Sequence, residues 1–519
     1  MGDEGVSRQG LASAAVCLLL ALAALVGPTG GRLSGPAEAR RPASPVARNP
    51  VPVVMVLFDE FPLASLLDRD LEIDPGLYPN FAALAEGSTW YRNATTVAEF
   101  TRGALPALLT GLEPEQALLS FTGQRPQSIF TLLEETHALR TSRAFPNLCD
   151  LSSCPRTPRV QGRPERVLRV VSREPRGAPM VAFMEGLEAT DEPCLCLLHM
   201  ILPHSPWRYL PSGQQYPGTS PMPGQVEIPG PGRKWRDHPW LVKQARQRHL
   251  LQVGFVDRVV GSLIDEMERL GVYDEALVVV AADHGVAFSP GLPKRGATRT
   301  TAGDIAWVPL FVKMPHQDTG AIVDEPVQTI DIVPTITAAL EIDGALPMQG
   351  VPLSQTGGRP EPRLLGTVVL PNDTSALSRA VERRFAVFPD AVHWLDLFRL
   401  APGEHGIWLD LPVGEVAAAP GVAATLEDAE GIEEASASDG RIPALVKGAL
   451  TGSRPGRSDR IAIAVNGRIV AVTETYTVGD VERFYALVPP TAYSAPPNEL
   501  RLFLIGDDAT LTEITPTAF

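Results

Sequence analysis

Short apolar runs alternate along the chain with longer segments in which apolar residues recur at helical spacing. The apolar runs occupy residues 51–58, 194–202 and 276–282. Residues 249–271 instead place apolar side chains three and four positions apart and end in glycine, and residues 79–87 also have a helical pattern. Apolar strands separated by helices are typical of a parallel sheet buried on both faces. We therefore predict an α/β fold in which helices cover both faces of a mixed, largely parallel central sheet.

The pattern changes near the C-terminus. Two β-rich runs are joined by Asn466-Gly467, a dipeptide that favours tight hairpin turns. The runs FYALVPP and LRLFLIG predict two further short strands. Residues 441–519 are therefore expected to form a small β-rich, sandwich-like domain.

Composition divides the rest of the chain. Residues 31–49 are rich in Pro, Arg and Ala, which is typical of a linker. Residues 361–440 are expected to be a connecting subdomain that ends in an acidic linker. The intervening residues 50–360 contain the alternating strands and helices and form the predicted main domain.

The N-terminal residues 1–30 are expected to be a signal peptide or a membrane anchor. No charged residue lies between Leu11 and Val26, a segment shorter than the ~20 residues that span a bilayer but typical of a signal-peptide core. Arg32 and Arg40 follow this segment, and under the positive-inside rule they favour the opposite orientation. A buried core helix is the structural alternative. We predict that the following domains are extracytoplasmic, either secreted or membrane-anchored.

Composition also narrows the class of protein. The 519 residues are 44% hydrophobic, so the chain can bury a core and is not wholly disordered. Its net charge of −15 argues against a nucleic-acid partner. Cys149 and Cys154 are close enough in sequence for a short loop disulfide outside the cytosol. Cys194 and Cys196 share one face of a predicted buried strand and are expected to be core residues.

Side chains that bind metals stand directly after the three apolar runs. In sheets of this class the binding site lies outside the carboxyl ends of the strands. Carboxylates together with one imidazole suit a divalent ion. A single aspartate in such a position is usually a turn or helix cap, but three such strand ends together predict a site. The residues are Asp59-Glu60, Asp283-His284 and His204.

Thr101 is a candidate nucleophile. It follows a short extended run and opens a predicted helix in the segment TRGALPALLTG. A helix N-terminus presents free N–H groups to an anion, and a hydroxyl beside a metal ion can lose its proton and attack phosphorus. Taken alone, Thr101 is more simply explained as an N-cap residue.

The ordered set of motifs resembles the alkaline phosphatase/sulfatase superfamily over about residues 50–355. FDEF and LVVVAADHG match the family's two metal-binding strand ends, and TRGALPALLTG matches its nucleophile helix. YPNFAALAEGSTWYRNATT, WVPLFVKMP and IDIVPTI agree with three further stretches. The threonine resembles the nucleophile of the lipoteichoic acid synthase and phosphoethanolamine transferase branch. The resemblance implies an alkaline phosphatase-like fold for the main domain.

The resemblance also implies a metal site. Asp59, Thr101, Asp283 and His284 would bind one divalent ion, which could be Mn, Zn, Mg or Ca. Glu60 stands where many family members have a second carboxylate, so it is a further candidate ligand. Thr101 would also be the nucleophile.

Three other residues are candidates for substrate binding. By resemblance, His204 in LPHSPW would contact a substrate phosphate or act as an acid/base, with a turn histidine as its structural alternative. Arg102 lies beside the nucleophile, and Arg295 follows the DHG motif. Either arginine can pair with an anionic group, and a solvated basic loop is the alternative for Arg295.

Two departures from the family pattern bear on the reaction. Sulfatases mature a Cys or Ser within C/S-x-P-x-R to formylglycine, whereas this chain has Thr101, Gly103 and Leu105 at those positions. The additional Asp-x-x-x-His ligand motif of two-metal phosphatases is absent from the sequence. A single metal with a Thr nucleophile resembles the phosphoglycerol and phosphoethanolamine transferases.

We therefore predict a metal-dependent hydrolase or transferase that acts on a phosphate ester through Thr101. A sulfuric ester hydrolase is the first alternative, and a non-catalytic cell-surface binding protein is the second. The expected partner is an anionic ester, such as a cell-envelope component. The membrane is a further partner if the N-terminal segment is retained, and no nucleic acid is expected.

Overall fold

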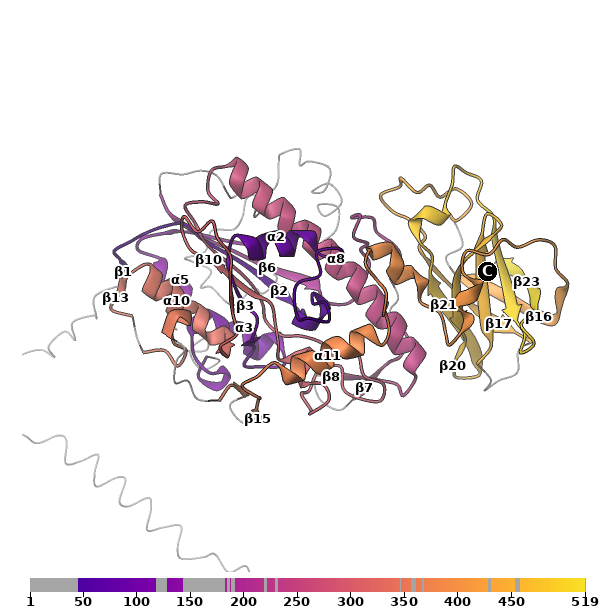
Figure 1. Ribbon diagram of the computed structural model, residues 1–519, viewed down its shortest axis with the longest axis horizontal. Helices are drawn as coiled ribbons and strands as arrows, with labels where there is room; N and C mark the ends of the chain where they lie inside the picture. The colour runs from indigo at the N-terminus through magenta and orange to yellow at the C-terminus, as the bar shows by residue number, and fades with distance from the viewer. Residues whose placement is uncertain are drawn as a thin grey trace, which may run out of the picture. The chain divides into compact units, whose positions relative to one another are not determined.

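The central sheet brings the predicted apolar strands next to one another. β2 (Val53–Asp59) pairs in parallel with both β6 (Cys194–Pro203) and β9 (Leu277–Ala282). β5 (Ala138–Ser142) pairs in parallel with β6. β10 (Leu310–Lys313) runs antiparallel to β9 and β3 (Thr89–Tyr91). The predicted mixed, largely parallel sheet is therefore confirmed. In the computed structural model drawn in Figure 1, the seven strands lie in the order β11 (Ala321–Val323), β3, β10, β9, β2, β6 and β5.

Most of the chain beyond its N-terminal segment is described by the structure. The apolar segment Leu11–Val26 and the Cys149/Cys154 pair lie outside the described residues. Within those residues, no helix combines the length and the apolar character needed to span a membrane. The described residues are 45–117, 128–142, 183, 187, 192–218, 222–228, 232–345, 347–355, 361–365, 368–427, 431–452 and 458–518.

The two faces of the sheet carry separate hydrophobic cores, because successive strand side chains point to opposite faces. Along β2, even-numbered residues such as Val54 and Phe58 enter one cluster, and odd-numbered residues such as Val53 and Leu57 enter the other. Helices α2 (Pro79–Glu86), α8 (Pro239–Arg269) and α11 (Ser375–Phe385) supply the first cluster. Helices α3 (Thr101–Thr110), α5 (Ile129–Leu133) and α10 (Ile332–Ala339) supply the second.

α8 begins at Pro239 and is longer than the helix predicted over 249–271. Its first turns carry buried polar residues, which interrupt the apolar pattern that the prediction depended on. Gln244 is 2% exposed and donates from Nε2 to the Tyr485 carbonyl at 2.6 Å. Arg248 is fully buried and donates to the Trp207 carbonyl at 3.0 Å. These hydrogen bonds make the polar burial tolerable.

The C-terminal part forms an eight-stranded sheet. The predicted hairpin at Asn466-Gly467 is confirmed, with positive φ angles of 52° and 75°. The sheet begins at Ala418, inside the segment 361–440 that was expected to be a connection. The strand order is β19 (Arg468–Glu474), β18 (Arg460–Val465), β22 (Leu500–Ile505), β23 (Leu511–Ala518), β16 (Ala418–Glu427), β17 (Leu445–Thr451), β21 (Val481–Leu487) and β20 (Tyr476–Val478).

This sheet folds back on itself and contacts α8. The Thr473 hydroxyl of β19 donates to the Tyr485 carbonyl of β21 at 2.8 Å, although these strands are not neighbours in the sheet. The Trp240 indole of α8 donates to the same hydroxyl at 3.0 Å. Buried hydrogen bonds therefore join the first turns of α8 to the C-terminal sheet.

Cys194 and Cys196 are 7% and 1% exposed in β6, so they are core residues as predicted. The structure also joins them in a disulfide, which the sequence analysis did not foresee. The remaining elements are short. They are β1 (Val46–Ala47), η1 (Leu63–Ser65), β4 (Ala94–Thr95), β7 (Gln225–Ile228), β8 (Gly232–Trp235), α9 (Ala302–Ile305), β12 (Val327–Gln328), η2 (Thr329–Asp331), β13 (Ile342–Asp343), η3 (Leu353–Gln355), β14 (Arg363–Leu364), β15 (Val368–Val369), η4 (Trp394–Arg399), η5 (His405–Trp408) and η6 (Pro490–Ala492).

Candidate active site

Two neighbouring parallel strands bring three metal-type side chains together. Asp59 is the last residue of β2, and Asp283 and His284 directly follow β9. Because β2 and β9 are parallel, their carboxyl ends meet at one edge of the sheet. One ligand atom from each residue lies within 4.8 Å of the others, and all three residues are buried. We refer to Asp59, Asp283 and His284 as the acidic group.

Thr101 reaches this acidic group from the start of α3. Its hydroxyl oxygen is 3.4 Å from Asp59 Oδ1 and 3.3 Å from His284 Nε2. Thr101 is the first helical residue, and Phe100 holds the N-cap position without a side-chain cap. The simpler N-cap explanation therefore does not fit the geometry. The first N–H groups of a helix have no intrahelical partner and are available to an anion at the Thr101 hydroxyl.

Backbone contacts fix the orientation of Asp283. Its Oδ1 accepts hydrogen bonds from the backbone N–H groups of His284 at 2.7 Å and Glu60 at 3.2 Å. The Thr96 hydroxyl donates to the Asp283 carbonyl at 2.5 Å. The next residue must be small, because a Cβ on Gly285 would lie 2.1 Å from the Asp304 carbonyl oxygen. The glycine of the DHG motif thus permits a close backbone approach that holds the site.

The hydrogen bond of His284 determines which of its nitrogens faces the site. Nδ1 lies 2.9 Å from the Gly285 carbonyl, which can only accept, so Nδ1 carries the proton. Nε2 is therefore a bare nitrogen, and it points at Thr101. Burial, together with nearby Arg295, lowers the pKa of His284 to about 4. The imidazole is therefore neutral near pH 7, as a metal ligand must be.

The acidic group has the chemistry of a divalent cation site. Burial, followed by repulsion from Asp283, raises the pKa of Asp59 to about 6. Burial raises the pKa of Asp283 to about 6 as well. Asp283 Oδ2 is buried and has no hydrogen-bond partner among the described residues. Two carboxylates, one neutral imidazole and an unsatisfied oxygen therefore fit a divalent ion.

Glu60 does not belong to this group, although it follows Asp59 in sequence. Its carboxylate lies 2.8 Å from both Lys294 Nζ and Arg295 Nη2. Its backbone is left-handed, with φ 65°, a conformation that is costly for a buried non-glycine residue. Burial alone would raise the pKa of Glu60, but neighbouring basic side chains outweigh it and hold the pKa well below its ordinary range. These belong to His204, Lys294 and Arg295.

The remaining candidates divide between the wall of a cavity and the exposed surface. His204, Lys294 and Arg295 line a cavity of about 430 Å³. His204 Nδ1 lies 2.5 Å from the Ser205 carbonyl, so it carries the proton, and Nε2 is 3.9 Å from Glu60 Oε2. Arg102 is exposed at the second position of α3 and is not among the described residues that line this cavity. The structure therefore brings His204 and Arg295 together and leaves Arg102 apart.

The contacts that support the site were not predicted from the sequence. Lys294 was one of three basic residues after the DHG motif, and nothing in its spacing singled it out as the partner of Glu60. Ser205 Oγ accepts from Lys294 Nζ at 3.2 Å, and Glu99 accepts from the Ala297 backbone N–H. These contacts join segments far apart in sequence, so no local pattern reports them.

The solved structures that resemble this chain share little sequence with it. The phosphonate monoester hydrolase of Agrobacterium radiobacter has a TM-score of 0.43 and 14% identity, and the match covers 60% of this chain and 78% of that one. The C-terminal periplasmic domain of EcEptC from Escherichia coli, solved in complex with Zn, has a TM-score of 0.44 and 14% identity. That match covers 64% of this chain and 98% of that one.

Sequence comparisons find one curated relative and one family model. The ulvan-active sulfatase of Formosa agariphila is 26% identical over 192 residues, which are 35% of this chain and 35% of that protein. The chain therefore matches about a third of the length of this curated relative. The model of the sulfatase family matches residues 52–342, more than half of the 519 residues.

Proposed function

The chain belongs to the sulfatase family, and we propose that it cleaves a phosphate ester through Thr101, either by hydrolysis or by transfer to an alcohol. The position of the Thr101 hydroxyl carries this proposal. It lies 3.4 Å from Asp59 and 3.3 Å from the bare nitrogen of His284, at the N-terminus of α3. A hydroxyl in this place can act as a nucleophile, and the free helix N–H groups can bind the phosphate oxygens.

The acidic group would hold one divalent ion. A bound ion supplies positive charge that favours the deprotonated hydroxyl and the negative charge developing on the phosphate. The Thr101 hydroxyl donates its hydrogen bond to Asp59, so its proton has an acceptor. Thr101 Oγ1 then bonds to phosphorus while the bond from phosphorus to the leaving oxygen breaks. Water or an acceptor alcohol later releases the phosphate from Thr101.

The cavity beside the acidic group would receive the rest of the ester. His204 is partly exposed there, with its side chain 27% accessible, so it can exchange a proton with the leaving or entering oxygen. Lys294 and Arg295 line the same cavity and give it positive charge. Because Glu60 already pairs with both of them, they are held in place before substrate arrives.

A sulfuric ester hydrolase is the second candidate, favoured by the similarity to the ulvan-active sulfatase. The residue at position 101 argues against it, because the family's sulfate-cleaving group matures from Cys or Ser and this chain has Thr. A threonine hydroxyl can still attack phosphorus directly. We therefore place the phosphate ester first.

The test compares matched aryl phosphates, aryl phosphodiesters and aryl sulfates with the purified full chain in Mn²⁺, Zn²⁺, Mg²⁺ or Ca²⁺. We expect phosphoester turnover that falls to background in Thr101→Ala and is partly kept in Thr101→Ser, which retains the hydroxyl on Cβ. Thr110→Ala is the control, because Thr110 lies at the other end of α3. Faster cleavage of aryl sulfates than of the matching phosphates would overturn the proposal in favour of the second candidate.

The proposal includes an extracytoplasmic location and an anionic ester of the cell envelope as substrate. Its support is the apolar N-terminal segment of the sequence. A C-terminal fusion to a reporter that is active only in an oxidising compartment tests the location. We expect an active fusion, and activity of a cytosol-specific reporter alone would contradict it.

A further inference from the structure

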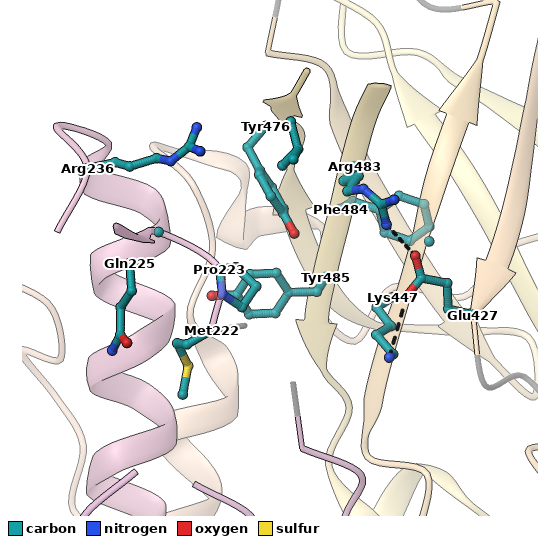
Figure 2. A pocket seen from close by; sticks show the side chains of 13 residues that line it. Met222, Pro223, Gln225, Arg236, Glu427, Lys447, Tyr476, Arg483, Phe484 and Tyr485 are labelled. Carbon is teal, nitrogen blue, oxygen red and sulfur yellow. Dashed lines mark hydrogen bonds and ion pairs between the residues drawn. The ribbon is translucent and has the colours of Figure 1, made fainter. Parts of the chain in front are cut away.

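A second cavity adjoins the candidate active site. It measures about 240 Å³ and is lined on one side by Met222, Gln225 and Arg236, near the hairpin β7–β8. Tyr476, Tyr485 and other residues of the C-terminal sheet line the opposite side, as Figure 2 shows. Met222 and Gln225 also line the active-site cavity. The two cavities therefore share a wall, and we call the second one the junction pocket.

The junction pocket has an excess of positive charge. Three basic side chains line it, from Arg236, Lys447 and Arg483, against one carboxylate, from Glu427. Glu427 pairs with Arg483 and, at 3.5 Å, with Lys447, so its charge is shared between them. Arg236 is exposed and is drawn in Figure 2 on the side opposite these pairs. An anionic group would therefore be attracted into the pocket.

Two polar groups of the lining are buried without a hydrogen-bond partner among the described residues. They are the Tyr485 hydroxyl and the Gln225 side-chain nitrogen. Tyr485 is 1% exposed, and Gln225 belongs to the wall shared by both cavities. Buried donors of this kind are normally satisfied. Both side chains line the pocket, and a small rotation of each would bring its donor to the oxygen atoms of a ligand.

The lining also contains aromatic surface. The rings of Tyr476 and Tyr485 meet edge to face, with centroids 6.0 Å apart. An aromatic ring accepts the C–H face of a sugar ring, while arginine, amide and hydroxyl donors bind the sugar's oxygens. At about 240 Å³ the pocket is below the roughly 300–1,000 Å³ range typical of drug-sized ligands, so it suits one small ring.

We propose that the junction pocket is a distal subsite for an acidic sugar unit of the substrate. This inference extends the proposed function, because the sugar would belong to the molecule whose ester is cleaved at Thr101. Because Met222 and Gln225 line both cavities, two units of one substrate can occupy neighbouring positions on either side of them. Recognition would depend on the carboxylate or other anionic group of the distal unit and on the face of its ring.

The test measures binding of digalacturonate to the purified full chain by isothermal titration calorimetry. Arg236→Gln should weaken binding about tenfold, the size expected for one charge-assisted hydrogen bond. Arg379→Gln is the matched control, because Arg379 is exposed on α11 and does not line the pocket. It should bind as the wild type does. The neutral disaccharide lactose should bind at least about tenfold more weakly than digalacturonate.

Two results would overturn the inference. One is no binding of digalacturonate to the wild type, and the other is equal binding by Arg236→Gln and Arg379→Gln. Digalacturonate has no phosphate ester, so its binding does not depend on Thr101 as a nucleophile. A chain that binds the sugar acid and cleaves no phosphate ester would contradict the proposed function and support the pocket. A chain that cleaves aryl phosphates and does not bind the sugar acid would support the proposed function and contradict the pocket as a sugar subsite.

Discussion

The side chains of two adjacent residues, Asp59 and Glu60, lie in opposite electrostatic surroundings. Both are buried, at 4% and 0% exposure. Asp59 faces a second carboxylate, Asp283, and its pKa rises to about 6 through burial and this repulsion. Glu60 contacts Lys294 and Arg295, and its pKa falls well below the ordinary range. Burial is common to the two residues, so the difference comes from their partners.

The difference shows which cluster lacks positive charge. Two cations neutralise Glu60, whereas the acidic group contains two carboxylates and an imidazole that is neutral near pH 7. Buried charges without partners are costly, and proteins either pair them or bind a metal. The acidic group is therefore the part of the site that a divalent cation would complete, and the Glu60 cluster is complete already.

The largest expected effect follows from changing the acidic group itself. Asp59→Asn removes a ligand charge and the carboxylate base that can take the Thr101 proton, so phosphoester turnover should fall by at least about 10⁴-fold. Steady-state kinetics with an aryl phosphate measure this loss. Asp343→Asn, at an exposed carboxylate, is the control and should keep wild-type turnover. If Asp59→Asn keeps a tenth of the wild-type rate, the acidic group is not the reactive centre.

His204 should have a smaller effect, because it exchanges a proton and neither attacks nor binds the cation. His204→Ala should lower turnover by about 10²–10⁴-fold, the usual contribution of a general acid or base. The loss should be smaller for a substrate whose leaving group needs no proton. His316→Ala, at an exposed histidine outside the site, should leave turnover unchanged. Equal losses for good and poor leaving groups would contradict an acid role.

Glu60 should increase the free energy of unfolding of the protein. Glu60→Gln leaves Lys294 and Arg295 buried without their counter-ion, and breaking a buried ion pair from one side costs about 3–5 kcal/mol. Urea unfolding measures this change in the free energy of unfolding. Glu382→Gln is the control, because its contact with Arg69 is 3.6 Å long and exposed, so its loss should cost less than about 1 kcal/mol. Equal losses in the free energy of unfolding for the two variants would mean that the buried ion pairs of Glu60 stabilise the protein no more than an exposed ion pair does.

The metal-free protein should lose stability as the pH rises. Asp59 and Asp283 have pKa values raised from 3.8 to about 6 in the folded state. A carboxyl group whose pKa is higher in the folded chain than in the unfolded chain stabilises the fold at pH values below its unfolded-state pKa. This stabilisation is lost as the pH rises through about 6. Only about one pH unit of the range from pH 5 to pH 8 lies below the folded-state pKa, so the expected loss over this range is roughly 1.4 kcal/mol per carboxylate, measured by urea unfolding in EDTA. Asp283→Asn should show a smaller loss, and a loss equal to that of the wild type would contradict this origin.

The sequence predicted the parts of the molecule that local patterns encode. Apolar runs gave β2, β6 and β9, and the residues after them gave the acidic group, because parallel strands must end at one edge of the sheet. The start of α3 placed Thr101 at this edge. Each of these features is local in sequence. It depends on a strand and the residues at its end, or on a helix and its first residue.

The parts that the sequence did not predict depend on contacts between distant segments. Glu60 pairs with Lys294 and Arg295 across more than two hundred residues, which redirects it away from the acidic group. The first turns of α8 were missed because Gln244 and Arg248 are buried polar residues. The C-terminal sheet was expected to start later than Ala418, because β16 is made of small residues that resemble a linker. Spacing alone does not report such tertiary partners.

We expect the acidic group, and not the adjacent Glu60 cluster, to hold one divalent ion. Elemental analysis of the purified full chain tests it most directly, with wild type, Asp283→Asn and Glu60→Gln treated alike. We predict one equivalent of a divalent metal in the wild type and in folded Glu60→Gln, and almost none in Asp283→Asn. Equal metal content in the wild type and Asp283→Asn would contradict the claim, as would loss of the metal from folded Glu60→Gln alone.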